Sequence, residues 1–220
     1  MRNIVLFDLD GTLFDTSEGI IKCVKYALSQ YGITEEDEVS LKRFIGPPLH
    51  QSFCTFYGFE PEKGVEATKL YRDRYKDKGV FECEPYEGIA DLLRKLKGMG
   101  AVLGVATSKP EVFANMILEK FGIARYFTEV TGSLLDNSRS KKSEVIEEEL
   151  KRLGADREQD RIIMVGDREH DIFGAKEKAL ESIGVYYGFA NKGELEAAGA
   201  DHVVNTVEEL DLLLTHIINH

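Results

Sequence analysis

The sequence predicts an α/β fold, a doubly wound parallel sheet of the Rossmann-like type with a small all-helical domain inserted after its first strand. Two observations carry this prediction. Short continuous apolar runs recur along the chain and are followed by helical patterns, as expected for strands that helices cover on both faces. One long stretch, residues 15–84, breaks this alternation, because it contains helical patterns and no convincing buried strand.

The predicted strands are short apolar runs with little polar alternation, and apolar residues return at helical spacing between them. The order of strand and helix indicates a parallel sheet with helices on both sides. The predicted strands are residues 4–7, 101–106, 162–165, 183–187 and, more weakly, 202–204. The helical patterns between and after them lie at 89–96, 112–121, 145–153 and 210–214.

The inserted stretch is interpreted as a helical domain. Its first helix carries apolar residues at helical spacing from Ile20 to Leu28 and stops at Gly32, a residue that favours helix ends. Further helices fit residues 49–57 and 65–78. We therefore expect an α/β core domain and a helical cap domain, with these boundaries: residues 1–14 and 85–220 for the core, and residues 15–84 for the cap.

Composition and charge narrow the classes of function. The 220 residues carry a formal net charge of -11, so the average surface repels nucleic acid and anionic membranes. The three cysteines form no CxxC pair, which argues against a disulfide framework or a zinc site and suits a reducing compartment. No apolar stretch approaches the ~20 residues of a membrane span. We expect a cytoplasmic protein whose partner is a small molecule, with no nucleic-acid polymer and no membrane.

Polar side chains stand at the ends of three predicted strands. Asp8 and Asp10 follow the first strand. Thr107 closes the second, and Asp167 and Asp171 follow the third. Ligands of open parallel sheets bind at the carboxyl ends of the strands, where loops and helix N-termini converge. The sequence therefore predicts a site at this edge of the sheet.

Clustered carboxylates repel one another unless something compensates their charge. Asp8 and Asp10 point to the same face if the strand persists, and Asp167 adds a third acid. A set of oxygen ligands selects a hard cation, and Mg2+ suits a few carboxylates with a substrate phosphate. A calcium loop of the EF-hand type does not fit, because Leu13 and Gly19 stand where it needs Gly and Glu.

Other residues near these strand ends have structural interpretations as well as functional ones. Ser108 and Glu111 match the S-x-x-E capping box, so Ser108 is also explained as a helix start, and Thr107 is the better candidate for a substrate hydroxyl. Asp171 is also explained as an acid in the first turn of a helix. Lys141 and Lys142 precede a helix; paired lysines are usually solvated, but a phosphate pocket needs a fixed cation.

These motifs, taken together, resemble a known family over the whole chain. DLDGT, the threonine of VLGVAT, a lysine before a helix and GDREHD resemble, in this order, the four motifs of the haloacid dehalogenase (HAD) superfamily of phosphatases. The helical insert is similar to the cap of the phosphoglycolate phosphatase branch. Within it, EGIIKCVKYAL and FIGPPLHQSF resemble small-molecule phosphatases that include bacterial nucleoside 5'-monophosphatases.

The resemblance implies roles for the acids. Asp8 would be the nucleophile that forms an aspartyl phosphate, and Asp10 would be the general acid and base. Mg2+ would be held by Asp8, the backbone carbonyl of Asp10, and Asp167. Dehalogenases of this superfamily lack the second acid, since a halide needs no protonation. The presence of Asp10 therefore favours phosphate esters as substrates.

The resemblance also implies a set of phosphate-binding residues. Thr107, together with Ser108, would bind the phosphoryl group, and Lys142 would neutralise the nucleophile and the phosphate. Asp171 would orient that lysine or a water at the metal. Relatives often have proline after the lysine, and this chain does not, so Lys141 stays an alternative. Lys142 is preferred because it fits the K-x-[DE]-V-I form of the motif.

The expected activity is that of a magnesium-dependent phosphatase which hydrolyses a small-molecule phosphate monoester through an aspartyl phosphate, similar to phosphoglycolate phosphatase. A 5'-nucleotidase acting on nucleoside monophosphates is the alternative. A receiver-type phosphoacceptor switch belongs to a different class that also uses clustered aspartates. Such a switch normally has its acid pair and its acceptor on different strands, whereas Asp8 and Asp10 share one strand here.

Overall fold

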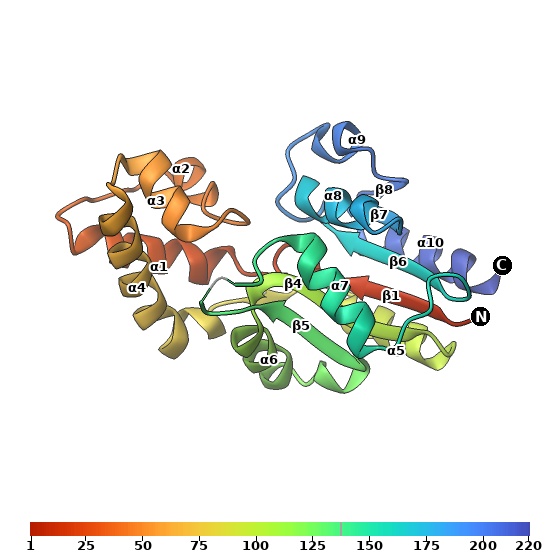
Figure 1. The fold of residues 1–220 in the computed structure, drawn as a ribbon. Coiled ribbons are helices and arrows are strands. Elements are labelled where there is room, and N and C mark those ends of the chain that lie inside the picture. Colours follow the sequence, from red (N-terminus) through yellow and green to blue (C-terminus); the bar gives the residue numbers. More distant parts are fainter. Residues whose placement is uncertain (137) are drawn as a thin grey trace. The chain divides into compact units, whose positions relative to one another are not determined.

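The computed structural model describes residues 1–136 and 138–220 (Figure 1). Within these residues the chain divides into two compact units, one formed by Met1–Asp15 with Pro85–His220 and the other by Thr16–Glu84. Two short strands, β2 (Phe14–Asp15) and β3 (Glu84–Pro85), pair with each other where the chain passes between the units.

The larger unit is built on a parallel sheet whose described strands run in the order β5-β4-β1-β6-β7-β8. All of these neighbouring pairs are parallel, so crossover connections join the strands, and the order runs from β1 outward to β4 and β5 on one side and to β6, β7 and β8 on the other. This arrangement confirms the predicted doubly wound α/β class. The strands are β1 (Asn3–Phe7), β4 (Val102–Pro110), β5 (Glu129–Ser133), β6 (Arg161–Gly166), β7 (Glu181–Val185) and β8 (His202–Val204).

The edge strand β5 is absent from the predicted strands. Its sequence, EVTGS, contains Val130 as the only large apolar residue, so it has no buried-strand pattern. The strand forms because it pairs with β4, with Val130 level with Val105 and Thr131 level with Ala106. Pairing with a neighbour, rather than local hydrophobicity, therefore decides this element.

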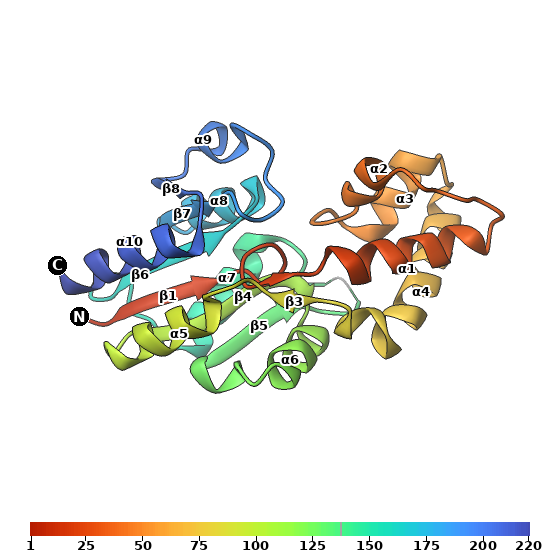
Figure 2. The ribbon, with the colours of Figure 1, turned by 180° about the vertical axis from the view of Figure 1, so that it is seen from behind.

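Helices cover both faces of the sheet, as Figures 1 and 2 show. α7 and α8 pack on the face that carries Ile4 and Leu6, where Val145, Ile146 and Ala175 join one buried cluster. α5 and α10 lie on the opposite face and contact each other. The helices of this unit are α5 (Ile89–Gly98), α6 (Glu111–Lys120), α7 (Lys142–Arg152), α8 (Glu169–Glu177), α9 (Glu194–Ala198) and α10 (Val207–Asn219).

The smaller unit is helical, and aromatic side chains form its core. The ring of Phe44 packs edge-on against Phe53, with the centroids 5.0 Å apart, and Phe53 stacks on Phe59 at 6.1 Å. α3 and α4 approach closely at Gly64, where a Cβ would lie 2.6 Å from the Sγ atom of Cys54. The helices are α1 (Ser17–Ser29), α2 (Glu38–Lys42), α3 (Leu49–Tyr57) and α4 (Pro61–Asp77).

Neither unit, in the described parts of the chain, contains a helix with the length and apolar character needed to cross a membrane.

Candidate active site

The carboxyl edge of the sheet in the larger unit gathers acidic side chains. Asp8 follows β1 directly, and its N–H donates to the Val165 carbonyl of β6 at 2.9 Å. Asp167 follows β6, and Asp171 lies in the first turn of α8. One carboxylate oxygen from each of Asp8, Asp167 and Asp171 lies within 4.8 Å of the others, and all three residues are buried. We call these residues the acid cluster.

Lys142 is the cation of this cluster. It is the first residue of α7 and is buried, whereas Lys141 before it is exposed. The Lys142 ammonium lies 2.6 Å from Oδ1 of Asp8 and 2.7 Å from Oδ1 of Asp171, and it donates to the Ala106 carbonyl at 3.0 Å. Of the two lysines that the sequence left open, Lys142 is therefore the one that the fold brings to the acids.

Burial and mutual repulsion disturb the titration of these groups. Burial raises the pKa of Asp8 to about 6, although the Lys142 ammonium opposes the shift. Burial, together with Asp171 and Asp8, raises the pKa of Asp167 well above its ordinary value. Burial lowers the pKa of Lys142, but the carboxylates of Asp171 and Asp8 outweigh it and leave that pKa raised. The cluster thus has more negative charge than Lys142 balances, so it could hold a metal cation.

Asp171 both caps a helix and contacts the lysine, two roles that the sequence analysis gave as separate explanations. Its Oδ2 accepts the Arg168 N–H at 3.0 Å, as a residue of the first helical turn does in a capping box. Its Oδ1 contacts Lys142. Both oxygens are thus engaged, so Asp171 holds the lysine in place and caps α8 with the same carboxylate.

Asp10 lies beside a lysine that sequence reasoning missed. The ammonium of Lys109 lies 2.8 and 3.0 Å from the two carboxylate oxygens of Asp10, and the lysine is buried. Lys109 stands two residues beyond Thr107, where the pairing of β4 with β5 shifts register between Ala106 and Pro110. The sequence feature that could have pointed to Lys109 is its place as a basic residue soon after Thr107, at the end of a predicted strand.

Thr107 and Ser108 differ in their surroundings. Thr107 is buried, and its hydroxyl oxygen accepts the Lys109 N–H at 3.2 Å, while Ser108 is exposed. The capping-box interpretation of Ser108 is wrong, because β4 continues to Pro110 and that proline is the N-cap of α6. Glu111 instead accepts the Gly132 N–H of β5 at 3.2 Å. The strand continues past Ser108, where the sequence predicts a helix start, because its pairing with β5 extends to Pro110.

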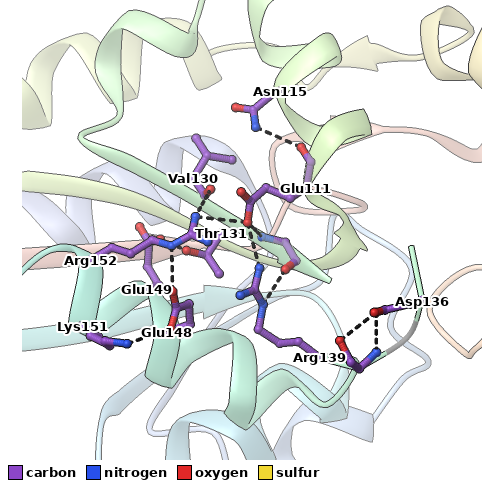
Figure 3. A network of polar contacts seen from close by, with 12 residues as sticks. Glu111, Asn115, Val130, Thr131, Asp136, Arg139, Glu148, Glu149, Lys151 and Arg152 are labelled. Atoms are coloured by element: carbon purple, nitrogen blue, oxygen red, sulfur yellow. Dashed lines mark hydrogen bonds and ion pairs between the residues drawn. The ribbon is translucent and has the colours of Figure 1, made fainter. Parts of the chain in front are cut away.

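A second group of charges ties α6, β5 and α7 together (Figure 3). Arg139, in the segment before α7, pairs with Glu111 at 2.9 Å and donates to the Gly132 carbonyl at 2.9 Å. Arg152, at the end of α7, pairs with Glu111 at 3.1 Å and with Glu148 at 3.1 Å. We call Glu111, Arg139, Glu148 and Arg152 the arginine network. The arginine network therefore ties the segment before α7, and the last residue of α7, to Glu111 of α6.

Glu149 lies next to this network but is buried. Its Oε2 accepts the Thr131 hydroxyl at 2.5 Å, and its Oε1 has no hydrogen-bond partner among the described residues. Burial raises the pKa of Glu149 to about 7. Glycine at position 104 makes room for this side chain, since a Cβ there would lie 2.2 Å from Oε1.

Comparisons with known proteins show which family this chain is similar to. A family model described as haloacid dehalogenase-like hydrolase matches residues 5–185. A 5'-nucleotidase of Pseudomonas aeruginosa is 44% identical over 90% of this chain and 89% of its own length. A pyrophosphatase, PpaX of Bacillus velezensis, is 34% identical over 94% of this chain and 93% of its own. Among solved structures, a predicted phosphatase from Clostridium acetobutylicum superimposes with a TM-score of 0.92 at 48% identity, covering 98% of this chain and 99% of that one.

Proposed function

The chain belongs to the haloacid dehalogenase-like hydrolases and is a phosphatase of that family, and on this premise we propose that it is a magnesium-dependent 5'-nucleotidase which works through an aspartyl phosphate. Asp8 is the proposed nucleophile. The helical unit, Thr16–Glu84, is the proposed cap, the part that reads the rest of the substrate. Phosphoglycolate and similar small phosphate monoesters form the second substrate class to be tested.

The observation that carries this proposal is the contact of Lys142 with Asp8 at 2.6 Å, deep in the acid cluster. A buried ammonium keeps the Asp8 carboxylate in the charged form that attacks phosphorus, and it adds positive charge where a phosphoryl group would bind. Asp171 fixes the ammonium in turn, at 2.7 Å. Phosphoryl transfer depends mainly on such positioning and charge neutralisation, so this trio supports the proposed chemistry.

The donor set also fits Mg2+. Asp8, the backbone carbonyl of Asp10, and Asp167 would hold it, since all three offer hard oxygen ligands. Asp171 also belongs to the acid cluster, where its oxygens contact Lys142 and the Arg168 N–H. When bound, Mg2+ would neutralise charge on the acids and on the phosphoryl oxygens of the substrate.

The proposed reaction proceeds in two steps. An oxygen of Asp8 attacks phosphorus, the bond from phosphorus to the leaving oxygen breaks, and protonated Asp10 gives its proton to that oxygen. The Asp10 carboxylate then takes a proton from water, the water oxygen attacks phosphorus, and the bond to Asp8 breaks, which releases phosphate. A positioned acid and base of this kind contributes about 100- to 10,000-fold. Lys109 holds the Asp10 carboxylate from both oxygens and so orients it for these transfers.

Nucleoside monophosphates are the proposed substrates because the Pseudomonas aeruginosa relative, which matches over most of both chains, is named a 5'-nucleotidase. The test is a screen of purine and pyrimidine 5'-monophosphates, phosphoglycolate and inorganic pyrophosphate, each with Mg2+ and with EDTA. We expect the highest kcat/KM for a nucleoside monophosphate and loss of turnover in EDTA. A preference for phosphoglycolate or pyrophosphate would contradict the substrate proposal, and full turnover in EDTA would contradict the metal proposal.

The number of phosphates released per chain distinguishes a phosphatase from a phosphoacceptor switch. A phosphatase releases many phosphates per chain, while a switch phosphorylates itself once and then stops. Quenching the reaction in acid and trapping the acyl phosphate with hydroxylamine should label Asp8. A label on another residue would contradict the nucleophile assignment.

A further inference from the structure

We propose that the segment Tyr187–Gly188–Phe189, which follows β7, is a positioning element that fixes the carboxylate of Asp167 for the metal. The proposal rests on the proposed metal role of Asp167. β7 is the neighbour of β6 in the sheet, so the segment after β7 emerges at the same edge as Asp167. Nothing in the sequence motifs points to these three residues.

The first observation is a main-chain hydrogen bond to the buried acid. The N–H of Phe189 donates to Oδ2 of Asp167 at 2.8 Å, and the hydroxyl of Thr12 lies 3.5 Å from Oδ1. Asp167 is fully buried, so water does not compete for these contacts. A backbone donor cannot rotate away as a side chain can, and it therefore sets the plane and direction of this carboxylate.

The second observation is steric. A Cβ added at Gly188 would lie 2.2 Å from the Gly11 carbonyl oxygen and 2.6 Å from both Cβ and Oδ2 of Asp167. The backbone of Gly188 is not in the left-handed region that favours glycine. The position therefore requires glycine for space alone, because the segment packs directly on the loop after β1 and on the carboxylate.

Gly11 also packs closely against this carboxylate. A Cβ there would lie 2.0 Å from Oδ2 of Asp167 and 2.6 Å from the ring of Phe189. The Asp167 carboxylate thus packs against two glycine backbones and accepts a backbone N–H. The segment therefore adds contacts between the loop after β1 and Asp167 to those that the pairing of β1 with β6 already makes.

Tyr187 anchors the segment to the same loop. Its hydroxyl donates to the Thr12 carbonyl at 3.1 Å, and its ring packs edge-on against Tyr86 with the centroids 4.9 Å apart. Partners that orient a metal ligand without touching the metal typically change metal affinity by about 10- to 100-fold when they are mutated. The segment therefore acts on the metal through Asp167, as a positioning element and not as a ligand.

The test measures Mg2+ binding to the full chain by isothermal titration calorimetry, with no substrate present. Gly188→Ala should weaken Mg2+ binding by about 10- to 100-fold. Gly98→Ala is the matched control, because a Cβ at Gly98 meets nothing within 4 Å, and it should bind Mg2+ like the parent. Circular dichroism and thermal unfolding in EDTA check that each variant is folded.

Tyr187→Phe keeps the proposal testable if Gly188→Ala does not fold. It removes one hydroxyl and should weaken Mg2+ binding by about 2- to 10-fold, the range of one net hydrogen bond. Asp167→Asn separates the two ideas. If Asp167→Asn binds Mg2+ like the parent, the metal role of Asp167 in the proposed function is wrong. If Asp167→Asn loses binding while the folded Gly188→Ala and Tyr187→Phe variants bind normally, the positioning role of the segment is wrong.

Discussion

The acid cluster and the arginine network are two groups of charged side chains in one unit, and they differ in how their charges are balanced. In the arginine network each glutamate has an arginine partner, such as Glu111 with Arg139 and Glu148 with Arg152. In the acid cluster Lys142 contacts Asp8 and Asp171, and Asp167 instead accepts a backbone N–H from Phe189. Paired charges at moderate exposure hold elements together, whereas buried charges in excess suit the binding of a cation.

The largest expected effect comes from removing the nucleophile from the acid cluster. Asp8→Asn keeps the shape of the side chain but removes the attacking carboxylate, so kcat should fall on the order of 10,000-fold or more. Steady-state phosphate release measures it. Asp91→Asn, on the exposed side of α5, is the control and should keep the parent kcat. Unchanged turnover in Asp8→Asn would refute the assignment of Asp8.

Lys142→Met tests whether the acid cluster depends on its cation. Removing Lys142 leaves the buried carboxylates of Asp8 and Asp171 without a positive partner, which should cost about 3–5 kcal/mol of the free energy of unfolding and abolish most turnover. Urea unfolding in EDTA measures the stability. Lys141→Met, at the exposed neighbouring position, should change it by less than about 0.5 kcal/mol. Equal effects at the two positions would show that burial of the lysine is irrelevant.

The buried Glu149, which lies next to the arginine network, makes the free energy of unfolding depend on pH. Its pKa is raised from its ordinary value of 4.5 to about 7, so the folded chain holds this proton more tightly than the unfolded chain. Its favourable contribution to the free energy of unfolding is therefore complete below about pH 4.5 and is lost as pH rises through 7. The loss amounts to about 3 kcal/mol, and Glu149→Gln should be more stable than the parent by that order at pH 8.

The measurement for Glu149 is urea unfolding of parent and variant at pH 5, 6, 7 and 8, since their difference cancels the titration of other groups. Glu148→Gln is the control from the adjacent position. The hydrogen bond from Arg152 lowers the pKa of Glu148. The contribution of Glu148 to the free energy of unfolding is therefore lost as pH falls, whereas that of Glu149 is lost as pH rises. If the difference in free energy of unfolding between the parent and Glu149→Gln did not change from pH 5 to pH 8, burial would not raise the pKa of Glu149.

Elements that have their own apolar pattern could be predicted from the sequence, and elements that depend on pairing with a distant strand could not. The buried strands β1 and β6 follow from continuous apolar runs, and the acids after them follow from strand order. β5 was missed because its pairing with β4, and not its own sequence, makes it a strand.

The same limit applies to the site. The sequence marks Lys109 only as a basic residue soon after Thr107, and its approach to Asp10 depends on β4 lying beside β1 in the sheet. Phe189 contributes its main-chain N–H, a group that every residue except proline possesses and that leaves no mark in the sequence. Gly188 is required by its distance from Gly11 and Asp167, which are far away in the chain. Contacts of this kind are visible only after folding.

The smallest expected effect lies in the arginine network, which positions α7 from outside the acid cluster. Arg139→Met removes the contacts to Glu111 and to the Gly132 carbonyl, and should cost about 1–2 kcal/mol of the free energy of unfolding, the scale of hydrogen bonds to a charged group. Because Lys142 keeps both of its acids, kcat should fall less than in Lys142→Met. Arg157→Met, which removes an exposed ion pair with Glu147, is the control for urea unfolding and should change stability by less than about 0.5 kcal/mol. An equally small effect of Arg139→Met would mean that the arginine network does not hold the segment before α7.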